Sequence, residues 1–547
     1  MTQIRRIRFA RPAGVNVVRS SAVNSGNTGH VTATTHDDGV IRSTIPARLD
    51  RLPWSSFHTR LVIALGVAWV LDGLEITVAS SIAGVLKTPQ ALHLSSSSVG
   101  LATGTVYLLG EVVGALVFGR MADAWGRRKL FMFTLGVYLF GSGLTALTWN
   151  RSTAAVGFLY LCRFVAGMGI GGEYAAINSA IDELIPAEHR GRVDIAVNGT
   201  YWGGAILGTL GTLLVLNNLD PSYSWRLGFV IGPVLAFVIL VVRRNLPESP
   251  RWQLMHGHVD EAEASIRGIE DEVTRRGYTL EEVGDDKAIE IRPTEKRGYF
   301  ALAWVLFRQM PRRSILGASL MITQSFLYNA IFFTYTLVLT TFFHVDAKTA
   351  PWYLIAFAVG NLAGPLTIGR LFDTIGRRVM ISSTYILSGV MLAVTAVLFN
   401  AGVLSALTQT IAWSVIFFFA SAGASAAYLT VSEIFPVEIR AQAIAVFFAI
   451  AQFFGSIGSW FYGVLIGNGH DPSQLELGYF IGAGVMVLGG VVEIFLGVPA
   501  ERQSLEDVAT PLSAVRRKAA QTMSGLRGSL THSADATGPQ VRTTGTT

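Results

Sequence analysis

Twelve long apolar stretches separated by short polar segments run along the chain from about residue 61 to residue 498. They lie at 61–86, 99–121, 130–149, 153–181, 194–217, 226–242, 314–343, 351–371, 379–400, 404–432, 442–467 and 478–498. Most supply the roughly 20 residues that a helix needs to cross a hydrocarbon layer about 30 Å thick. They lack the alternation of a membrane strand, and lipid admits only helices or closed barrels. The pattern predicts an all-α polytopic membrane protein of twelve transmembrane helices.

Polar segments divide these helices into two sets of six and flank both sets. The predicted units are a disordered N-terminal tail at 1–58, a six-helix bundle at 59–243, a linker at 244–313, a second six-helix bundle at 314–499 and a disordered C-terminal tail at 500–547. The linker is rich in both acidic and basic residues, and we expect it to be partly helical around 260–274. The Arg-rich start leaves two interpretations open, an unstructured cytosolic tail or an organelle transit peptide.

The composition supports a membrane protein. Charged residues make up 15% of the 547 residues and apolar residues 51%, whereas an average soluble domain has about 25% charged residues. The single cysteine, Cys162, excludes a disulfide scaffold and a multi-cysteine metal site, and we expect no metal or cofactor. The formal net charge is +6, but the basic residues form short clusters between apolar runs. We therefore expect the lipid bilayer, and not nucleic acid, as the partner.

Basic residues in the short loops predict the orientation. One side of the membrane receives Arg120, Arg127, Arg128, Lys129, Arg190, Arg192, Arg370, Arg377, Arg378 and Arg440. The other side receives Lys87, Arg151, Arg226 and Lys348. By the positive-inside rule, the first side and both termini are cytoplasmic, and the protein is expected in the cell membrane.

An internal repeat relates the two halves by a shift of 250 residues. The loop pattern from Gly119 to Arg128 recurs from Gly369 to Arg378, and Glu183-x-x-Pro-x-x-x-Arg190 recurs at Glu433 to Arg440. Two patterns with one offset predict parallel repeats about an axis along the membrane normal. Such pseudo-symmetric halves place a substrate site between them near the midplane and rock to give alternating access.

These loops resemble the signature motif of the major facilitator superfamily and its second copy, which implies the major facilitator fold. Within it, Pro247–Trp252 (PESPRW), Arg163 with Glu183, and Ser432–Pro436 resemble the sugar-porter branch. The resemblance implies a cytoplasmic gate that holds the outward-facing state and opens in each cycle. The gate residues are Gly119, Asp123, Arg127, Arg128, Glu183, Arg190, Gly369, Asp373, Arg377, Arg378, Glu433 and Arg440. Alternatively, these arginines only determine topology.

Ionisable residues at membrane depth are costly and indicate function. All five clear cases lie in the first half: Asp72, Glu75, Glu111, Arg163 and Glu173. Their counterparts under the shift carry no charge: Ile322, Ser325, Asn361, Trp413 and Gly423. Glu493 lies within two turns of a helix end, so it is interpreted as reaching the membrane surface.

Helix geometry brings three of these residues to one depth. At 1.5 Å per residue, Asp72 lies roughly 16 Å and Glu75 about 21 Å from the cytoplasmic edge, and Arg163 lies about 15 Å from the outer edge. Asp72 and Glu75 share a helix face, so one of them is expected to hold a proton, with Arg163 as counter-ion.

The resemblance supports this interpretation. Gly73-Leu74-Glu75 occupies the place of a Gly-Tyr-Asp whose acid couples to protons in sugar-porter symporters, and residues 72–75 also resemble an element of aromatic-acid:proton symporters. The alternative is a permanent salt bridge in a facilitator. Glu111 and Glu173 are candidate cavity residues, with packing against unseen partners as the alternative.

The resemblance also indicates where a solute is bound. Gln324 and Asn329 match solute-binding positions of the sugar porters in helix 7, where Thr323 replaces a further glutamine. Asn198, Tyr428 and Gln452 fall on or near other contact positions. The substitutions reduce the hydrogen-bonding set, which argues against a sugar. Alternatively, Gln324 and Asn329 bond within the bundle.

The leading hypothesis is an inward, proton-coupled symport of a small polar solute, an organic or aromatic acid or a sugar-like metabolite, by a monomer. The alternatives are a proton-antiport exporter and a non-transporting membrane sensor. No nucleophile–base spacing, metal cluster or Walker-type loop is present in the sequence, so no enzymatic activity is predicted.

Overall fold

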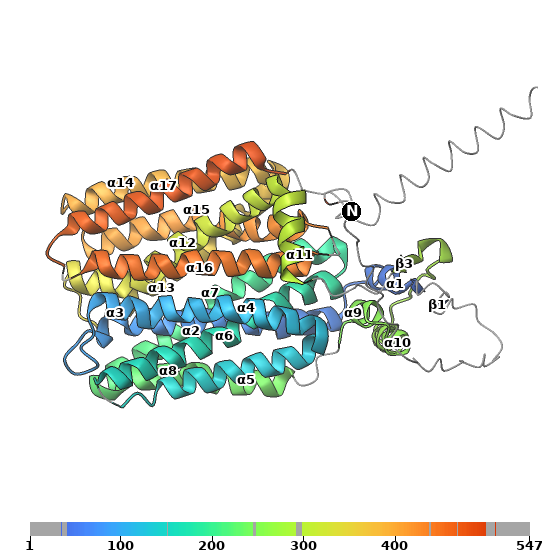
Figure 1. Cartoon of the computed structure of the whole chain (residues 1–547), viewed down its shortest axis with the longest axis horizontal. Coiled ribbons are helices and arrows are strands. Elements are labelled where there is room, and N and C mark those ends of the chain that lie inside the picture. The colour runs from blue at the N-terminus through green and yellow to red at the C-terminus, as the bar shows by residue number, and fades with distance from the viewer. Residues whose placement is uncertain are drawn as a thin grey trace, which may run out of the picture.

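The computed structural model describes residues 34–35, 41–149, 151–243, 248–291, 298–436, 439–467, 469–498 and 509. In Figure 1, long helices run side by side through the body of the molecule, and a smaller group of elements lies beyond one end of it. We call the end with these smaller elements the linker end, and the opposite end the far end.

The first six membrane helices follow the predicted apolar runs. They are α2 (Ser56–Leu86), α3–η1–α4 (Ser96–Gly100, Leu101–Thr105 and Val106–Trp125), α5 (Arg127–Thr145), α6 (Thr153–Leu184), α7 (Ala187–Asn218) and α8 (Pro221–Arg243). The middle piece of the second helix, η1, is a π-helical turn, which opens the backbone hydrogen-bond pattern there.

The second six helices repeat this order. They are α12 (Pro311–Phe342), α13 (Pro351–Thr374), α14 (Arg377–Asn400), α15 (Ala406–Glu433), α16 (Arg440–Ile466) and α17 (Pro472–Leu496). Among the described residues, ten helices are long and apolar enough to cross a membrane, and shorter apolar helices at 129–145 and 222–238 complete the twelve. The predicted twelve-helix fold is confirmed.

The two copies of the loop motif share a backbone feature. Gly126 and Gly376 precede α5 and α14, with φ values of 85° and 114°. Only glycine adopts such angles at little cost. The repeat seen in the sequence is therefore a repeat of backbone geometry, which turns the chain sharply between two antiparallel helices.

The two halves contact one another toward the far end. Ser80 on α2 donates a hydrogen bond to the carbonyl of Phe332 on α12, and Thr336 donates to the carbonyl of Ser80 at 2.5 Å. Ser96 on α3 donates to the carbonyl of Gly467, just past α16, at 2.5 Å. Large apolar side chains on the outside of the bundle are exposed, among them Phe140, Leu214, Phe237 and Phe495, as expected of a surface that contacts lipid.

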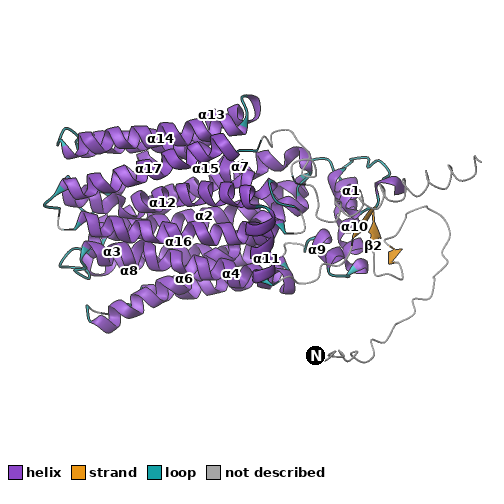
Figure 2. Cartoon of the chain, turned by 45° about the horizontal axis from the view of Figure 1, so that its top comes forward, coloured by secondary structure: helices purple, strands orange, loops and turns teal. Residues whose placement is uncertain are grey.

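The linker end differs from the expectation of a disordered tail up to residue 58. Strands β1 (Thr34–Thr35), β2 (Ile41–Ser43) and β3 (Ile289–Ile291) form an antiparallel sheet, drawn in orange in Figure 2. Helix α1 (Ile45–Asp50) lies against α10 (Val259–Arg275), the helix predicted around 260–274. The other elements here are α9 (Pro250–Met255), η2 (Asp285–Lys287), α11 (Tyr299–Trp304) and η3 (Val305–Gln309).

Charge pairing and burial explain why the segment before α2 is ordered. Arg48 pairs with Glu263 at 2.8 Å and with Glu270, and Arg51 pairs with Glu270 at 2.5 Å. Ile45 and Leu49 are buried, as is the apolar face of α10 that includes Ile266. Residues 45–51 thus bind the linker, an interaction between segments more than 200 residues apart that a local pattern does not reveal.

Candidate functional site

Helix α2 carries Asp72 and Glu75 through the interior of the bundle, and glycines set its distance from α7. A Cβ atom on Gly73 would collide with the carbonyl of Tyr201 on α7, and one on Gly204 would collide with the carbonyl of Val70 on α2. The two backbones therefore touch at the level of Asp72, with no space for a side chain between them.

Glu75 and Arg163 form an ion pair with no solvent-accessible side-chain surface. The Glu75 carboxylate also accepts hydrogen bonds from the hydroxyl of Tyr138 at 2.7 Å and from that of Ser142 at 3.1 and 3.2 Å. The structure thus brings together two of the three residues predicted for proton coupling. The hydroxyl partners were not predicted, because Tyr and Ser inside an apolar helix give no distinctive pattern.

Arg163 is held by more than Glu75. Its guanidinium donates to the carbonyls of Ala102 and Thr103 in the π-helical turn η1, both at 3.3 Å. The rings of Tyr107 and Phe229 lie 4.4 and 5.0 Å from its central carbon, which adds cation–π contacts. The π-helical turn thus supplies carbonyl groups to the single arginine at this depth.

Asp72, the third predicted residue, lies one helical turn from Glu75 and is partly accessible. Within the described part of the chain it forms no ion pair with Arg163, and its buried Oδ1 has no hydrogen-bond partner. Glu75, Glu111 and Glu173 are all close enough to interact with it electrostatically. Asp72 is therefore a carboxyl group whose charged neighbours are other carboxyl groups.

Glu111 on α4 connects the two halves. Its Oε2 accepts a hydrogen bond from the side-chain amide of Gln452 on α16. Its Oε1 is buried and, among the described residues, has no hydrogen-bond partner. Glycine packing holds it in place, because a Cβ on Gly171 of α6 would collide with the backbone of Glu111. Glu173, the other candidate cavity residue, is buried on α6.

The predicted solute-binding residues of the second half lie in two small hydrogen-bonded groups. Gln324 donates to the hydroxyl of Tyr428 at 2.8 Å. The side-chain oxygen of Gln452 accepts from Ser325 at 2.8 Å and from Asn329 at 3.5 Å. Asn198, the predicted contact from the first half, is partly exposed on α7. Gln452 therefore links the amide group of the second half to the Glu111 carboxylate of the first.

A row of aromatic rings runs from the acids toward the second half. The ring centroids of Trp69 and Tyr201 are 6.3 Å apart, those of Tyr201 and Trp202 are 5.0 Å apart, and those of Trp202 and Tyr328 are 5.9 Å apart. Tyr201 lies close enough to Asp72, Glu111, Tyr328 and Tyr428 to interact with them electrostatically. Sequence reasoning missed this row, because aromatic residues in an apolar run look like ordinary core.

The gate motif is visible mainly in its second copy. Arg377 on α14 pairs with Glu433 on α15, Arg378 donates to the carbonyl of Ile494, and Arg440 donates to that of Phe435 at 3.3 Å. These contacts lie within the second half. Gly119 and Gly369 lie in α4 and α13 near the linker end. The side chains of Asp123, Arg127, Arg128, Glu183, Arg190 and Asp373 lie outside the described residues.

Glu493 on α17 contradicts its interpretation as a residue that reaches the membrane surface. Its side chain is fully buried, and neither carboxylate oxygen has a hydrogen-bond partner among the described residues. Helix packing covers it: a Cβ added to Gly497, one turn further on, would lie 2.7 Å from its Oε1. The position of Glu493 near a helix end therefore did not predict the exposure of its side chain.

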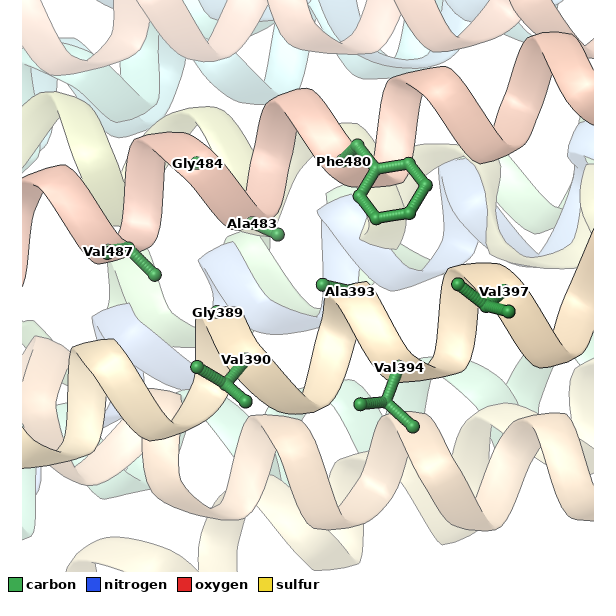
Figure 3. A pocket seen from close by; sticks show the side chains of 9 residues that line it. All are labelled: Gly389, Val390, Ala393, Val394, Val397, Phe480, Ala483, Gly484 and Val487. Carbon is green, nitrogen blue, oxygen red and sulfur yellow. The ribbon is translucent and has the colours of Figure 1, made fainter.

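An apolar groove of about 530 Å³ lies between α14 and α17 and is lined by glycine, alanine, valine and phenylalanine. Figure 3 shows Val390 and Val394 on α14 and Phe480 on α17 along it. These side chains are exposed on the surface of the bundle, so the groove suits lipid chains better than a polar solute. Within the described residues, no cluster of three His, Cys, Asp or Glu side chains is arranged to hold a metal ion.

Comparisons with known proteins agree with this architecture. Residues 61–510 match a family model described as "Sugar (and other) transporter". The niacin transporter NiaP of Acinetobacter baylyi is 25% identical over 396 residues, which cover 72% of this chain and 84% of that protein. A putative niacin/nicotinamide transporter of Bacillus subtilis is 32% identical over 194 residues, 36% of this chain and 46% of that protein.

Solved structures show the same fold. The inward-open conformation of the xylose transporter XylE from E. coli superposes with a TM-score of 0.64 at 19% identity, covering 82% of this chain and 98% of that one. A partially occluded inward-open form of the same transporter gives a TM-score of 0.62 at 17% identity over 79% of this chain and 97% of that one.

Proposed function

The chain belongs to the sugar (and other) transporter family, and we propose that it is a proton-coupled symporter that carries a small polar solute across the membrane by alternating access. One observation carries this proposal. A buried ion pair, Glu75–Arg163, lies one helical turn from Asp72, a partly accessible acid whose Oδ1 has no hydrogen-bond partner among the described residues.

The proton step follows from the charges at this depth. Asp72 and Glu75 interact electrostatically, and Arg163 pairs with Glu75. A proton that binds Asp72 removes one negative charge from the group and leaves Arg163 balanced by Glu75. A proton that transfers to Glu75 weakens its ion pair, and Arg163 is then held by the carbonyls of η1 and the ring of Tyr107. This exchange links protonation to the packing of α2 against α6.

The solute step uses the second half. Gln324, Asn329 and Gln452 offer amide groups beside the hydroxyls of Ser325 and Tyr428. Gln452 also bonds to Glu111 of the first half, so a solute that replaces these bonds contacts both halves at once. The niacin transporter and niacin/nicotinamide transporter relatives support a small metabolite of about the size of one pyridine ring.

The orientation follows from loop charge. We propose that the linker end, with both termini, faces the cytoplasm, and that the chain works as a monomer in the cell membrane. The ordered contacts between halves at the far end would then close the outer side. The resemblance of the loops supports a role for Arg377 and Glu433, and for their counterparts Arg127 and Glu183, in a cytoplasmic gate.

Uptake in proteoliposomes tests this function. The full chain is reconstituted, a panel of radiolabelled small metabolites is supplied, and uptake is compared with and without an acidic exterior. We expect at least one solute to accumulate above its external concentration only when the exterior is acidic. If an inward proton gradient instead drives the solute out of the vesicles, the protein is a proton-antiport exporter. If a solute binds but is not transported, the protein is a sensor.

A further inference from the structure

The middle of the bundle has a surplus of negative charge. Three acids lie there, Asp72, Glu75 and Glu111, with one basic residue, Arg163. Helices α12 to α17 contribute no charged residue at the same depth, since the counterparts of these four positions are Ile322, Ser325, Asn361 and Trp413. The second half therefore cannot balance this charge.

Arg163 does not balance it either, because among the described residues its ion pair is with Glu75. It pairs with Glu75, donates to the carbonyls of Ala102 and Thr103, and contacts two aromatic rings. Arg163 thus pairs with Glu75, and among the described residues it forms no ion pair with Asp72 or Glu111.

Within this group of acids, two carboxylate oxygens are buried without a hydrogen bond among the described residues, Oδ1 of Asp72 and Oε1 of Glu111. An unpaired carboxylate is very costly to bury, so such groups take a proton or meet a cation. Asp72 is partly accessible and adjoins the Glu75–Arg163 pair, which suits a proton site. Glu111 is 1% exposed and bonds to Gln452 across the interface, which suits contact with the solute.

The aromatic residues beside these acids add a second feature. Tyr201 interacts with Asp72 and Glu111 and also with Tyr328 and Tyr428 of the second half, and Trp202 lies between Tyr201 and Tyr328. The faces of aromatic rings attract cations, and carboxylates next to aromatic rings bind ammonium groups. An anionic solute would meet like charges here.

We propose that the central site takes a solute that carries a positive charge, an ammonium group or an N-alkylated ring nitrogen, held by the Glu111 carboxylate beside the ring of Tyr201. The amides of Gln452 and Asn329 bind its polar part, and Asp72 carries the coupled proton. This inference rests on the proposed function and names the chemical class of its solute. It departs from the organic acids and sugar-like metabolites that the sequence suggests.

Matched probes of one shape and different charge test the proposal. Binding of 1-methylnicotinamide (a cation), nicotinamide (neutral) and nicotinate (an anion) to the purified full chain is measured by calorimetry. Choline and its neutral carbon analogue 3,3-dimethyl-1-butanol provide a second set without a ring. We expect the cation of at least one set to bind at least about tenfold more tightly than its neutral partner, and nicotinate to bind most weakly. Equal binding of cation and neutral analogue, preference for nicotinate, or no binding of either cation would overturn the proposal.

A variant assigns the effect to Glu111. Glu111→Gln keeps the length of the side chain and removes its charge, so the preference for the cation should fall to about twofold or less. Glu281→Gln, the same change at an exposed position of the linker, should keep the full preference. If Glu111→Gln retains the preference, the carboxylate is not the binding group and the proposal is wrong. If this variant does not fold, the preference of the wild-type chain for cationic over neutral probes still tests the proposal.

The same probes separate this inference from the proposed function. Proton-driven uptake of nicotinate in proteoliposomes would overturn the cationic class and leave the symporter proposal in place. Binding of 1-methylnicotinamide that depends on Glu111, with no flux under any pH gradient, would support the cation site and contradict the transport proposal.

Discussion

Arg163 on α6 and Glu75 on α2 form an ion pair in which neither side chain is accessible to solvent. A buried pair of this kind contributes little net stability, because the loss of hydration of two ions offsets their attraction, yet removal of one partner leaves an uncompensated charge. The pair therefore links α2 and α6 in a manner that a change of protonation can reverse.

The first prediction concerns the stability of this pair. Arg163→Met should lower the free energy of unfolding by about 3–5 kcal/mol, because it leaves the Glu75 carboxylate buried without its counter-ion. The double variant Glu75→Gln with Arg163→Met should recover a large part of this loss. Unfolding of the purified protein in detergent, followed by circular dichroism, measures both. If the double variant loses as much stability as the two single variants together, the two residues do not stabilise one another.

The second prediction concerns the contact between α2 and α7. Gly204→Ala should destabilise the protein by about 1–3 kcal/mol, because the added methyl group overlaps the carbonyl of Val70. Gly203→Ala is the matched control, since a Cβ at the neighbouring position meets nothing within 4 Å and alanine favours a helix. Thermal unfolding of both variants checks the prediction, and equal unfolding temperatures would contradict the close packing at the level of Asp72.

The third prediction concerns pH and the docking of α1 onto α10. Burial alone would raise the pKa of Glu270, but the hydrogen bonds and charges of Arg48 and Arg51 outweigh burial and lower the pKa. Because the pKa of Glu270 is lower in the folded protein, the contact is at full strength above the ordinary pKa of 4.5. The contact weakens as the pH falls below 4.5 and is lost once the pH falls through the folded-state pKa.

Hydrogen exchange of residues 45–50 measures this docking. Protection should be constant between pH 6 and about pH 5 and fall by about pH 3. Glu270→Gln should show low protection at every pH, whereas Glu261→Gln, an exposed site on the same helix, should behave like the wild-type chain. Protection that persists in Glu270→Gln would show that apolar contacts alone hold α1.

The fourth prediction concerns Glu493. Because its carboxylate is buried and lacks hydrogen-bond partners among the described residues, Glu493→Met should be neutral or raise the free energy of unfolding by about 1 kcal/mol. Unfolding in detergent compares it with Glu476→Met, a less buried acid at the other end of α17. A loss of 3 kcal/mol or more in Glu493→Met would show that the carboxylate has an important partner.

Features that belong to a single helix could be predicted from the sequence, whereas contacts between distant helices could not. Apolar runs, the repeat and the depth of Asp72, Glu75 and Arg163 are properties of single helices, and simple helix geometry predicted them. The bond between Glu111 and Gln452 joins residues 341 positions apart, and no spacing within one helix predicts it. The same holds for Tyr138 and Ser142, which become ligands of Glu75 only through packing.

Segments rich in polar residues were the least predictable. Residues 41–50 look like the rest of a polar tail, and their order comes from strand β3 and from the acidic and apolar faces of α10, all more than 200 residues away. Glu493 shows the reverse case, in which closeness to a helix end suggested exposure and packing buried the carboxylate. In both cases the partner, and not the local sequence, decides the structure.

The central claim, that Asp72 and Glu75 beside Arg163 couple protons to solute movement, is tested most directly by proton uptake. Proteoliposomes with a trapped pH indicator and no pre-formed gradient receive a solute that the uptake panel has identified. The account predicts that solute entry acidifies the lumen with the wild-type chain and with Glu281→Gln. It predicts that solute entry leaves the lumen pH unchanged in the double variant Asp72→Asn with Glu75→Gln. Acidification by the double variant at the wild-type rate would contradict the account.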